Sequence, residues 1–371
     1  KGWDPVIGPF FNRGLMMLDF DEHMFHRRIM QEAFTRSRLT GYVEHIDRVA
    51  SAVIANDWVE NDPRFLFYPA VKELTLDIAS VVFMGHEPGT DKELVTKVND
   101  AFATTTRSGG AILRFAVPPF KWWQGLRARK VLEAYFAERI TERRNAIGTD
   151  MLTVLCHSTD DDGNSFSDDD IVNHMIFLLM AAHDTSAIAL SMLTYELGRN
   201  IKWQRALRDE ALARPNDAPA LADLEDYPLL DAAFKEILRM YAPAGTLFRQ
   251  TVKDTEIAGH YIPRKSQVAI NVYASMRLPD WWKDPDRFDP GRFTDAGAFN
   301  SVSRYVFAPF GGGAHKCIGQ QFADMTVKAT MHQILRRFEW SVPSGYIPRM
   351  TWGTGPTPAD GLPMSVRRRT G

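Results

Sequence analysis

The sequence predicts a mainly helical fold with small β-sheets, and three observations support that class. Apolar residues recur at helical spacing through most of the first two thirds of the chain. One such stretch, 167–198, is long enough to form a central helix. After Tyr241 the pattern changes to short β-like runs separated by Gly and Pro. The expected class is therefore α+β, with helices dominant.

The central helix has a clear start. Ser167-Asp168-Asp169-Asp170 forms a capping box and places acidic residues in the first turn, where the helix dipole favours negative charge. Its roughly 30 residues would span about 45 Å at 1.5 Å per residue. Shorter helices are expected wherever the same periodicity lies between polar turns, over residues 22–34, 42–56, 64–84, 91–106, 121–146 and 228–241.

The β-like runs cover residues 246–251, 256–262 and 267–271. Residues 279–309 follow, rich in Pro, Trp, Asp and Phe and without periodicity. So long an irregular segment argues against a compact fold unless it is functional. No linker or internal repeat divides the chain, so a single domain over residues 1–371 is expected.

Composition excludes several classes of function. A net charge of −2 and a pI of about 6.6 give no basic footprint for nucleic acid. The two cysteines, Cys156 and Cys317, do not suggest a disulfide framework. No uncharged apolar run approaches membrane-spanning length. We therefore expect a soluble cytoplasmic protein.

The most informative motif is Phe310-Gly311-Gly312-Gly313-Ala314-His315-Lys316-Cys317-Ile318-Gly319. Its glycines allow positive φ and a close approach of backbone to a flat cofactor, and the helix that follows favours thiolate over thiol. A lone cysteine is more often a buried apolar residue, and a glycine run is more often a surface turn. A zinc site would need more cysteines or histidines nearby. The complete spacing favours a thiolate on haem iron.

This segment resembles the haem-binding loop of cytochromes P450, and the resemblance extends along nearly the whole chain. It implies the P450 fold, with a long central helix, a proximal cysteine loop and an ordered meander at 279–309. It also implies haem b as the cofactor, with Cys317 as the axial ligand of its iron and Phe310, Gly311 and Gly319 around it. By the same resemblance Lys1 falls shortly before the helix that carries His23. The earlier helices and strands of a typical member are therefore expected to be missing from an N-terminally incomplete chain.

Within the central helix, Asp184 and Thr185 interrupt an apolar run. Buried, they are costly unless they are hydrogen-bonded or used in chemistry; a threonine bonded to its own helix and a solvated aspartate would be the plain structural explanation. The segment Ala181-Ala182-His183-Asp184-Thr185-Ser186 resembles the oxygen-activation motif of P450s. That resemblance implies that Thr185 holds dioxygen and a water, that Asp184 relays protons, and that Ala181 lies at the haem. Ala182 stands where the family often has glycine, which leaves the local groove geometry open.

Glu236 and Arg239 lie three residues apart, on one face of a helix. Alone they would be a commonplace surface pair. In P450s a Glu-x-x-Arg pair joins an arginine from the meander, and Arg292 stands at the matching position. A structural role behind the haem is expected for all three.

Four residues match the P450 contacts to the haem propionates. His23 and Arg27 are one helical turn apart and share a face. Arg249 and His315 match the remaining contacts. Each of the four could instead be an ordinary solvated side chain.

Substrate contacts are expected, by resemblance, from apolar residues on the distal side, although such residues more often belong to a core. They are Phe177, Ala181, Ala244, Leu247 and Trp352.

No electron-transfer module lies within the chain. Electrons from NAD(P)H would therefore come through a separate ferredoxin and ferredoxin reductase, docking near Lys316, Arg28 and Lys328. No nucleic-acid partner is expected, and the protein is expected to be a monomer.

The expected activity is that of a haem-thiolate monooxygenase, which inserts one oxygen atom from O2 into a hydrophobic small molecule such as a terpenoid, a steroid or a fatty acid. A first alternative is a peroxygenase or isomerase of the same fold, which needs no reductase. Asp184 and Thr185 argue against it. A second alternative is a non-catalytic haem-binding sensor, which no sequence feature recommends.

Overall fold

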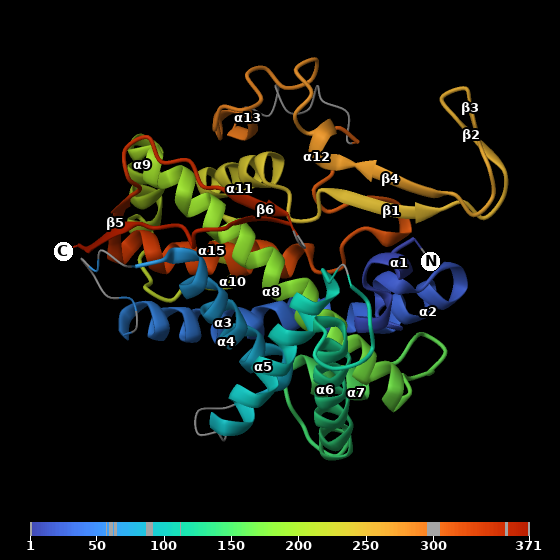
Figure 1. The fold of residues 1–371 in the computed structure, drawn as a ribbon. Coiled ribbons are helices and arrows are strands. Elements are labelled where there is room, and N and C mark those ends of the chain that lie inside the picture. The colour runs from blue at the N-terminus through green and yellow to red at the C-terminus, as the bar shows by residue number, and fades with distance from the viewer. Residues whose placement is uncertain are drawn as a thin grey trace. The chain divides into compact units, whose positions relative to one another are not determined.

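The computed structural model describes residues 2–56, 58, 62, 65–86, 92–111, 113–294, 305–352 and 355–369. The chain forms two compact units, each assembled from separate stretches of sequence. Within the described residues the structure is mainly helical, with four small antiparallel sheets of two strands each (Figure 1). The predicted class, mainly α with small sheets, is confirmed. Unit 1 comprises Lys1–Thr35, Ser80–Ala181 and Thr246–Asn271, and unit 2 comprises Arg36–Ala79, Ala182–Gly245 and Val272–Gly371.

A helical hairpin dominates unit 1. Its two helices, α5 and α6, pack so closely that a Cβ atom on Gly125 would lie 2.3 Å from the Cβ of Ser108. Only glycine fits at that point of α6. The same unit contains α1 (Asp4–Ile7), α2 (Phe20–Gln31), α5 (Lys92–Gly109), α6 (Lys121–Arg143) and α7 (Met151–His157).

The central helix is α8 (Asp168–Arg199), which begins in unit 1 and ends in unit 2. Its start follows the predicted capping box, because the backbone N–H of Asp170 donates to Ser167 Oγ at 3.2 Å. In the part of the chain described, α8 alone is long and apolar enough to cross a membrane, but 83% of its most apolar window is buried. It is therefore a core helix.

A histidine pair anchors α2 to the first half of α8 within unit 1. Nδ1 of His26 lies 2.7 Å from Nε2 of His174, and both side chains are buried. Burial lowers the pKa of both imidazoles, that of His174 to about 3. Both rings are therefore neutral at neutral pH, and one donates a hydrogen bond to the other.

Unit 2 is built around α15 (Gln320–Arg337), which packs along α3 (Arg36–Asn56) (Figure 1). Residues 325–335 of α15 are all buried, although they include Thr326, Lys328 and Gln333. The helix α4 (Phe67–Met84) spans both units. The remaining helices of unit 2 are α9 (Ile201–Leu212), α10 (Leu221–Glu225), α11 (Pro228–Met240), α12 (Val272–Ser275) and α13 (Gly291–Thr294).

Each sheet is a single antiparallel pair. In unit 1, β1 (Thr246–Gln250) pairs with β4 (Gln267–Asn271), and β2 (Thr255–Ile257) pairs with β3 (His260–Ile262). The pairs in unit 2 are β5 (Phe338–Ser341) with β8 (Ser365–Arg368) and β6 (Met350–Trp352) with β7 (Pro356–Pro358).

Several predicted boundaries were wrong. The run 256–262 is two strands, because Ala258 and Gly259 both have positive φ and form a hairpin turn. The helix predicted from residue 42 begins at Arg36, α6 ends at Arg143, and α2 ends at Gln31 with a 3-10 turn after it. The predicted starts at Arg64 and Asp91, and residues 295–304 of the irregular segment, lie outside the described residues.

Candidate active site

The cysteine loop leads directly into α15. Gly311 and Gly313 have φ values of +69° and +68°, a backbone conformation that favours glycine. The backbone N–H of Cys317 donates to the carbonyl oxygen of Phe310 at 2.9 Å, which closes the loop. Cys317 is exposed three residues before the first residue of α15, Gln320. The loop thus presents an accessible thiol near the positive end of a helix dipole.

In the part of the chain that the structure describes, no other donor set competes with Cys317 for a metal. Within the described ranges, no three His, Cys, Asp or Glu side chains are grouped so that they could hold a metal ion. The second cysteine, Cys156, is buried, and burial raises the pKa of its thiol to about 11. A single accessible thiol suits a metal whose other ligands come with a prosthetic group, as the four ring nitrogens of a haem do.

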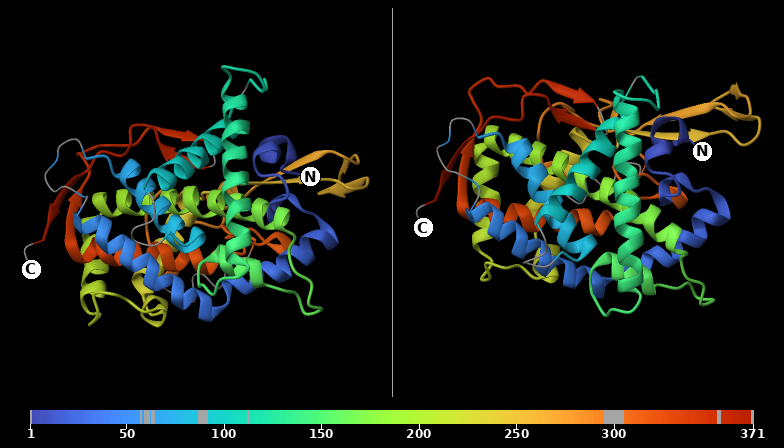
Figure 2. Two further views of the ribbon diagram at one scale, coloured as in Figure 1. Left: turned by 90° about the horizontal axis from the view of Figure 1, so that it is seen from below. Right: turned by 60° about the horizontal axis from the view of Figure 1, so that its bottom comes forward.

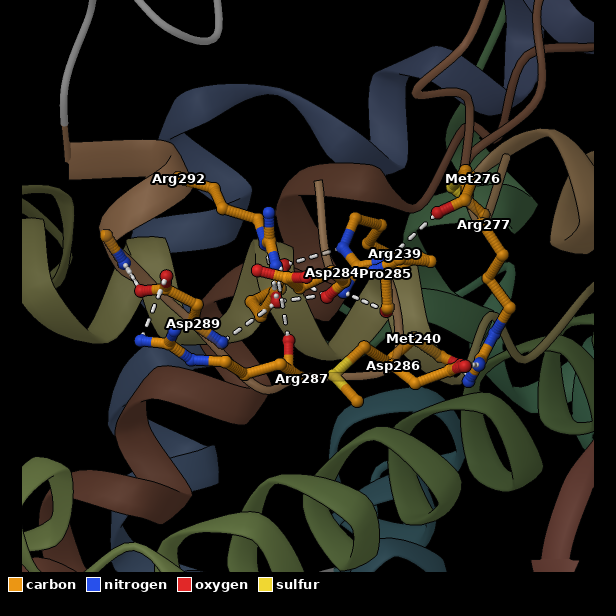
Figure 3. A network of polar contacts seen from close by, with 12 residues as sticks. Arg239, Met240, Met276, Arg277, Asp284, Pro285, Asp286, Arg287, Asp289 and Arg292 are labelled. Carbon is orange, nitrogen blue, oxygen red and sulfur yellow. Dashed lines mark hydrogen bonds and ion pairs between the residues drawn. The ribbon is translucent and has the colours of Figure 1, made fainter. Parts of the chain in front are cut away.

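The Glu236 carboxylate is buried in unit 2 and bonded to several polar groups. Figure 3 shows three of its partners, Arg239, Asp289 and Arg292, gathered in one network. Its two oxygens accept from Nε and Nη2 of Arg239 at 2.7 and 2.9 Å, and one of them lies 3.2 Å from Nε of Arg292. The backbone N–H of Asp289 adds a fourth hydrogen bond at 3.0 Å. Glu236 and Arg239 are both fully buried. The three residues predicted to cluster therefore lie together.

Arg239 also fixes the irregular backbone that follows α12. Its Nη1 donates to the carbonyl oxygen of Met276 at 3.0 Å and its Nη2 to that of Pro285 at 2.8 Å. The guanidinium lies 5.3 Å from the ring centroid of Trp282. Aromatic contacts continue from Trp282 to Phe293 and Phe307, and Phe307 precedes the cysteine loop by three residues. The network at Glu236 is thereby connected to the segment that delivers Cys317.

One face of α8 is partly exposed around Ala181–Thr185. From Ile171 to Gly198 every residue of the helix is buried except Ala181, Ala182 and Thr185. These three lie on the same side, because residues three and four apart share a helical face. The helix continues as regular α-helix through Ala182. The alanine is thus accommodated without a break in the helix.

The carboxylate of Asp184 is buried beside two nitrogen groups of unit 2. Oδ1 accepts from Nζ of Lys72 at 2.8 Å and lies 3.1 Å from Nδ1 of His183. Nε2 of His183 lies 3.0 Å from the backbone carbonyl oxygen of Lys72. Burial alone would raise the pKa of Asp184, but the hydrogen bond from His183 and the charge of Lys72 outweigh it. The pKa therefore lies well below its usual range, and the group is ionised at neutral pH.

Trp352 and Gly245, the neighbour of Ala244, border the side chain of Tyr273. The ring of Trp352 lies 5.3 Å from that of Tyr273, and a Cβ on Gly245, next to Ala244, would lie 3.1 Å from the Cβ of Tyr273. A Cβ on Gly355 would contact both the carbonyl of Pro243 and Cδ1 of Ile188, one turn after Thr185. Ala244 and Trp352 thus belong to segments that meet near the second half of α8.

Of the remaining predicted site residues, unit 2 contains His315 and Gly319, which directly precedes α15, and unit 1 contains the others. His23 is buried on α2, Arg27 is half-buried one turn later, and Arg249 is half-buried on β1. His315 lies in the 3-10 turn Gly313–His315 of unit 2, also half-buried. Among the substrate candidates, Leu247 lies on β1, and Phe177 packs against Gly14, where a Cβ would lie 2.5 Å from the Cβ of Phe177.

One expected surface residue is not on the surface. The side chain of Lys328 is 4% exposed, and its ammonium lies 2.9 Å from Asp324 and 3.1 Å from Asp231. Two carboxylates therefore hold this lysine in the interior of unit 2, and assigning it to partner docking was wrong. Lys316 and Arg28 are exposed.

Comparison with known proteins decides the family. The sequence profile of the cytochrome P450 family matches residues 3–355. The chain belongs to the cytochrome P450 family. This P450 is 56% identical over its whole length to cytochrome P450 136 of Mycobacterium tuberculosis, of which it covers 75%. It is 25% identical to the β-amyrin 6-β-monooxygenase of Solanum lycopersicum, with 93% of this chain and 72% of that protein aligned. A solved structure, retinoic acid-bound cyanobacterial CYP120A1, has a TM-score of 0.87 at 26% identity, with coverage of 98% and 82%.

Family membership makes the chain a haem-dependent oxidoreductase of the monooxygenase class. The cysteine loop fits that cofactor, because it offers one accessible thiol and glycines whose positive φ allows a close approach of the backbone. Sequence reasoning missed Lys72 as the partner of Asp184. The two residues are 112 positions apart, and nothing in the α4 sequence distinguishes Lys72 from a solvated lysine.

Replacing Glu236 with alanine should strongly destabilise this P450. The buried Arg239 would keep its charge but lose its carboxylate, which costs about 3–5 kcal/mol in the free energy of unfolding. Glu225→Ala is the matched control, because Glu225 forms a two-bond pair with Arg36 on the surface and should cost less than about 1 kcal/mol. Urea unfolding of the holoproteins measures both values. Equal losses in the two variants would refute the proposed weight of the Glu236 network.

Lys72→Met should destabilise the protein in a pH-dependent way. Because the pKa of Asp184 is depressed in the folded state, the ion pair contributes stability above the ordinary aspartate pKa of about 4 and loses that contribution as the pH falls. We expect the variant to lose about 1–3 kcal/mol at neutral pH and the deficit to shrink below about pH 4.

The measurement is urea unfolding of wild type, Lys72→Met and Lys72→Arg across that pH range. The arginine variant keeps the charge and should recover much of the loss. Lys202→Met, at an exposed position of α9, is the control. A deficit that is the same at every pH would show that packing, rather than charge, accounts for the role of Lys72.

Proposed function

We propose that this P450 inserts one oxygen atom from O2 into an apolar isoprenoid. Cys317 holds the haem b, and the electrons come from NAD(P)H through a separate ferredoxin and ferredoxin reductase. When bound, the haem supplies the iron centre at which dioxygen is reduced. The observation that carries the proposal is the ionised, buried Asp184 next to Thr185, where one face of α8 is partly exposed. A purely structural haem protein would have no use for a buried acid at that place.

The chain's own groups can move protons from solvent toward Thr185. Lys72 has a side chain that is 33% exposed, whereas that of Asp184 is 7% exposed, so the ion pair runs from solvent toward the interior of unit 2. Asp184 is ionised at neutral pH, so it holds no proton of its own and relays one by accepting it transiently from solvent and releasing it. The hydroxyl of Thr185 can accept one hydrogen bond and donate another, which suits it to hold a water in line with that transfer.

The remaining site residues have binding roles in this proposal. Phe310, Gly311 and Gly319 shape the cysteine loop. The small side chain of Ala181 leaves room for the cofactor beside α8. His23, Arg27, Arg249 and His315 bind the propionates, because each can donate a hydrogen bond and the arginines carry positive charge.

The proposed substrate class rests on the relatives and on the apolar residues. One relative is named for its action on β-amyrin and a similar structure has retinoic acid bound. Both molecules are isoprenoids whose surface is mostly hydrocarbon. Phe177, Leu247, Ala244 and Trp352 would offer aliphatic and aromatic contacts to such a compound. We further propose a monomeric enzyme in the cytoplasm, with Lys316 and Arg28 available to an acidic electron donor.

Turnover by holoenzyme tests the proposal. The protein is reconstituted with ferredoxin, ferredoxin reductase and NAD(P)H, and retinoic acid, β-amyrin, a steroid and a fatty acid are first screened for a low-to-high-spin shift of the haem. Compounds that shift it should yield products that carry one atom of labelled O2. Turnover with peroxide but never with reductant would contradict the proposal and support a peroxygenase.

Asp184→Asn should lower product formation by at least about tenfold, because the amide cannot relay a proton. Consumption of NAD(P)H should fall less, so that less product forms per NAD(P)H. Asp168→Asn is the control, since Asp168 is an exposed acid in the first turn of the same helix. Equal coupling in the two variants would exclude Asp184 from proton delivery.

A further inference from the structure

The ion pair of Lys72 and Asp184 has a third neighbour, Tyr68. Tyr68 and Lys72 are one turn apart on α4, so their side chains share a face of that helix. Nζ of Lys72 lies 5.9 Å from the centroid of the Tyr68 ring, within the distance of about 6 Å at which a ring attracts a cation. The same Nζ lies 2.8 Å from Oδ1 of Asp184. The ammonium thus interacts with both the carboxylate and the ring.

The side chain of Tyr68 is held by a residue outside α4. Its hydroxyl is hydrogen-bonded to the side chain of Thr357 on β7. Across the β6–β7 pair, Oγ1 of Thr357 lies 2.8 Å from Oγ1 of Thr351. Burial raises the pKa of the Tyr68 hydroxyl, and the charge of Asp184 raises it further, so the group is neutral at neutral pH. Tyr68 can therefore orient the ammonium of Lys72 without taking a proton from it.

The backbone at the start of α4 is fixed by the same part of unit 2. The N–H of Tyr68 donates to the carbonyl oxygen of Gly361 at 3.0 Å, and Leu66 forms an antiparallel β-bridge with Pro363. In Figure 2 this segment after β7, in red, lies beside the light-blue start of α4. The backbone and the side chain of Tyr68 are thus both held in place, whereas the side chain of Lys72 is long and 33% exposed.

We propose that Tyr68 is a positioning residue for proton delivery, which holds the ammonium of Lys72 on Asp184. A lysine side chain loses much rotamer freedom when it is fixed in one geometry, and that cost weakens a partly exposed ion pair. A fixed ring beside the ammonium lowers the number of other conformations open to Lys72. The proposal rests on the proposed function of Asp184, because Tyr68 acts on proton delivery only through Lys72.

Urea unfolding of the holoprotein at several pH values tests the proposal. Tyr68→Leu removes the ring and the hydroxyl, so Lys72 should be held less well and the pKa of Asp184 should rise toward its ordinary value. Because that pKa is depressed in the folded state, the loss of stability should be present at neutral pH and shrink below about pH 4. Its pH-dependent part should be roughly a third of that in Lys72→Met. His183, which also faces Asp184, is unchanged in every variant.

Three further comparisons isolate the role of Tyr68. In a protein that already carries Lys72→Met, Tyr68→Leu should cause no pH-dependent loss. Tyr68→Phe and Thr357→Val break the same hydrogen bond, so their losses should be similar and should not add in the double variant. Phe67→Leu is the matched control, because the buried Phe67 ring packs against Trp58 and its loss should be the same at every pH. Haem content shows that each variant is folded.

The proposal is overturned if the loss in Tyr68→Leu is the same at every pH, or if its pH-dependent part persists beside Lys72→Met. Either result would leave Tyr68 with a packing role alone. In turnover with a compound that yields product, Tyr68→Leu should form about twofold less product per NAD(P)H. If Asp184→Asn uncouples the reaction and Tyr68→Leu does not, positioning by Tyr68 is refuted. If Asp184→Asn has no effect on coupling, the proposed function fails instead, whatever the pH dependence of Tyr68→Leu.

Discussion

The irregular chain and the cysteine loop of unit 2 depend on one constraint: the buried carboxylate of Glu236 must remain paired. Glu236 and Arg239 are fully buried, and an unpaired charge at either position would be strongly destabilising. Arg239 satisfies its other donors on the carbonyls of Met276 and Pro285. The irregular chain after α12 thereby acquires a fixed path without regular secondary structure. Through Trp282, Phe293 and Phe307 the same constraint reaches the segment that presents Cys317.

A second buried carboxylate, Asp184, solves the same electrostatic problem differently. Glu236 is surrounded by Arg239, which is fully buried, by Arg292 and by backbone groups. Asp184 is paired with a lysine that is one third exposed. The first arrangement is closed and suits a structural role, whereas the second leads toward solvent and suits proton movement. The exposure of the paired cation therefore distinguishes the roles of Glu236 and Asp184 more clearly than their sequence motifs do.

The sequence predicted those features of the fold that depend on residues close together in the chain. The capping box at Ser167 and the apolar periodicity after it located α8 to within one residue, because both depend on near neighbours. The glycine spacing around Cys317 and the Glu-x-x-Arg pair marked residues that the structure brings into one unit. The pairs of Lys72 with Asp184 and of Lys328 with Asp231 could not be predicted, because each joins two different helices and an isolated lysine usually indicates a solvated surface. Strands β5 to β8, of three or four residues each, were not predicted from the sequence.

The ligand at the iron is the central claim of this account, and the absorption spectrum of reduced protein under carbon monoxide tests it most directly. Wild type and Cys156→Ser should show the red-shifted Soret band of thiolate-ligated haem, because the buried Cys156 thiol takes no part. Cys317→His should replace that band with an unshifted one. A red-shifted band that persists in Cys317→His, or a wild type that lacks it, would contradict the account.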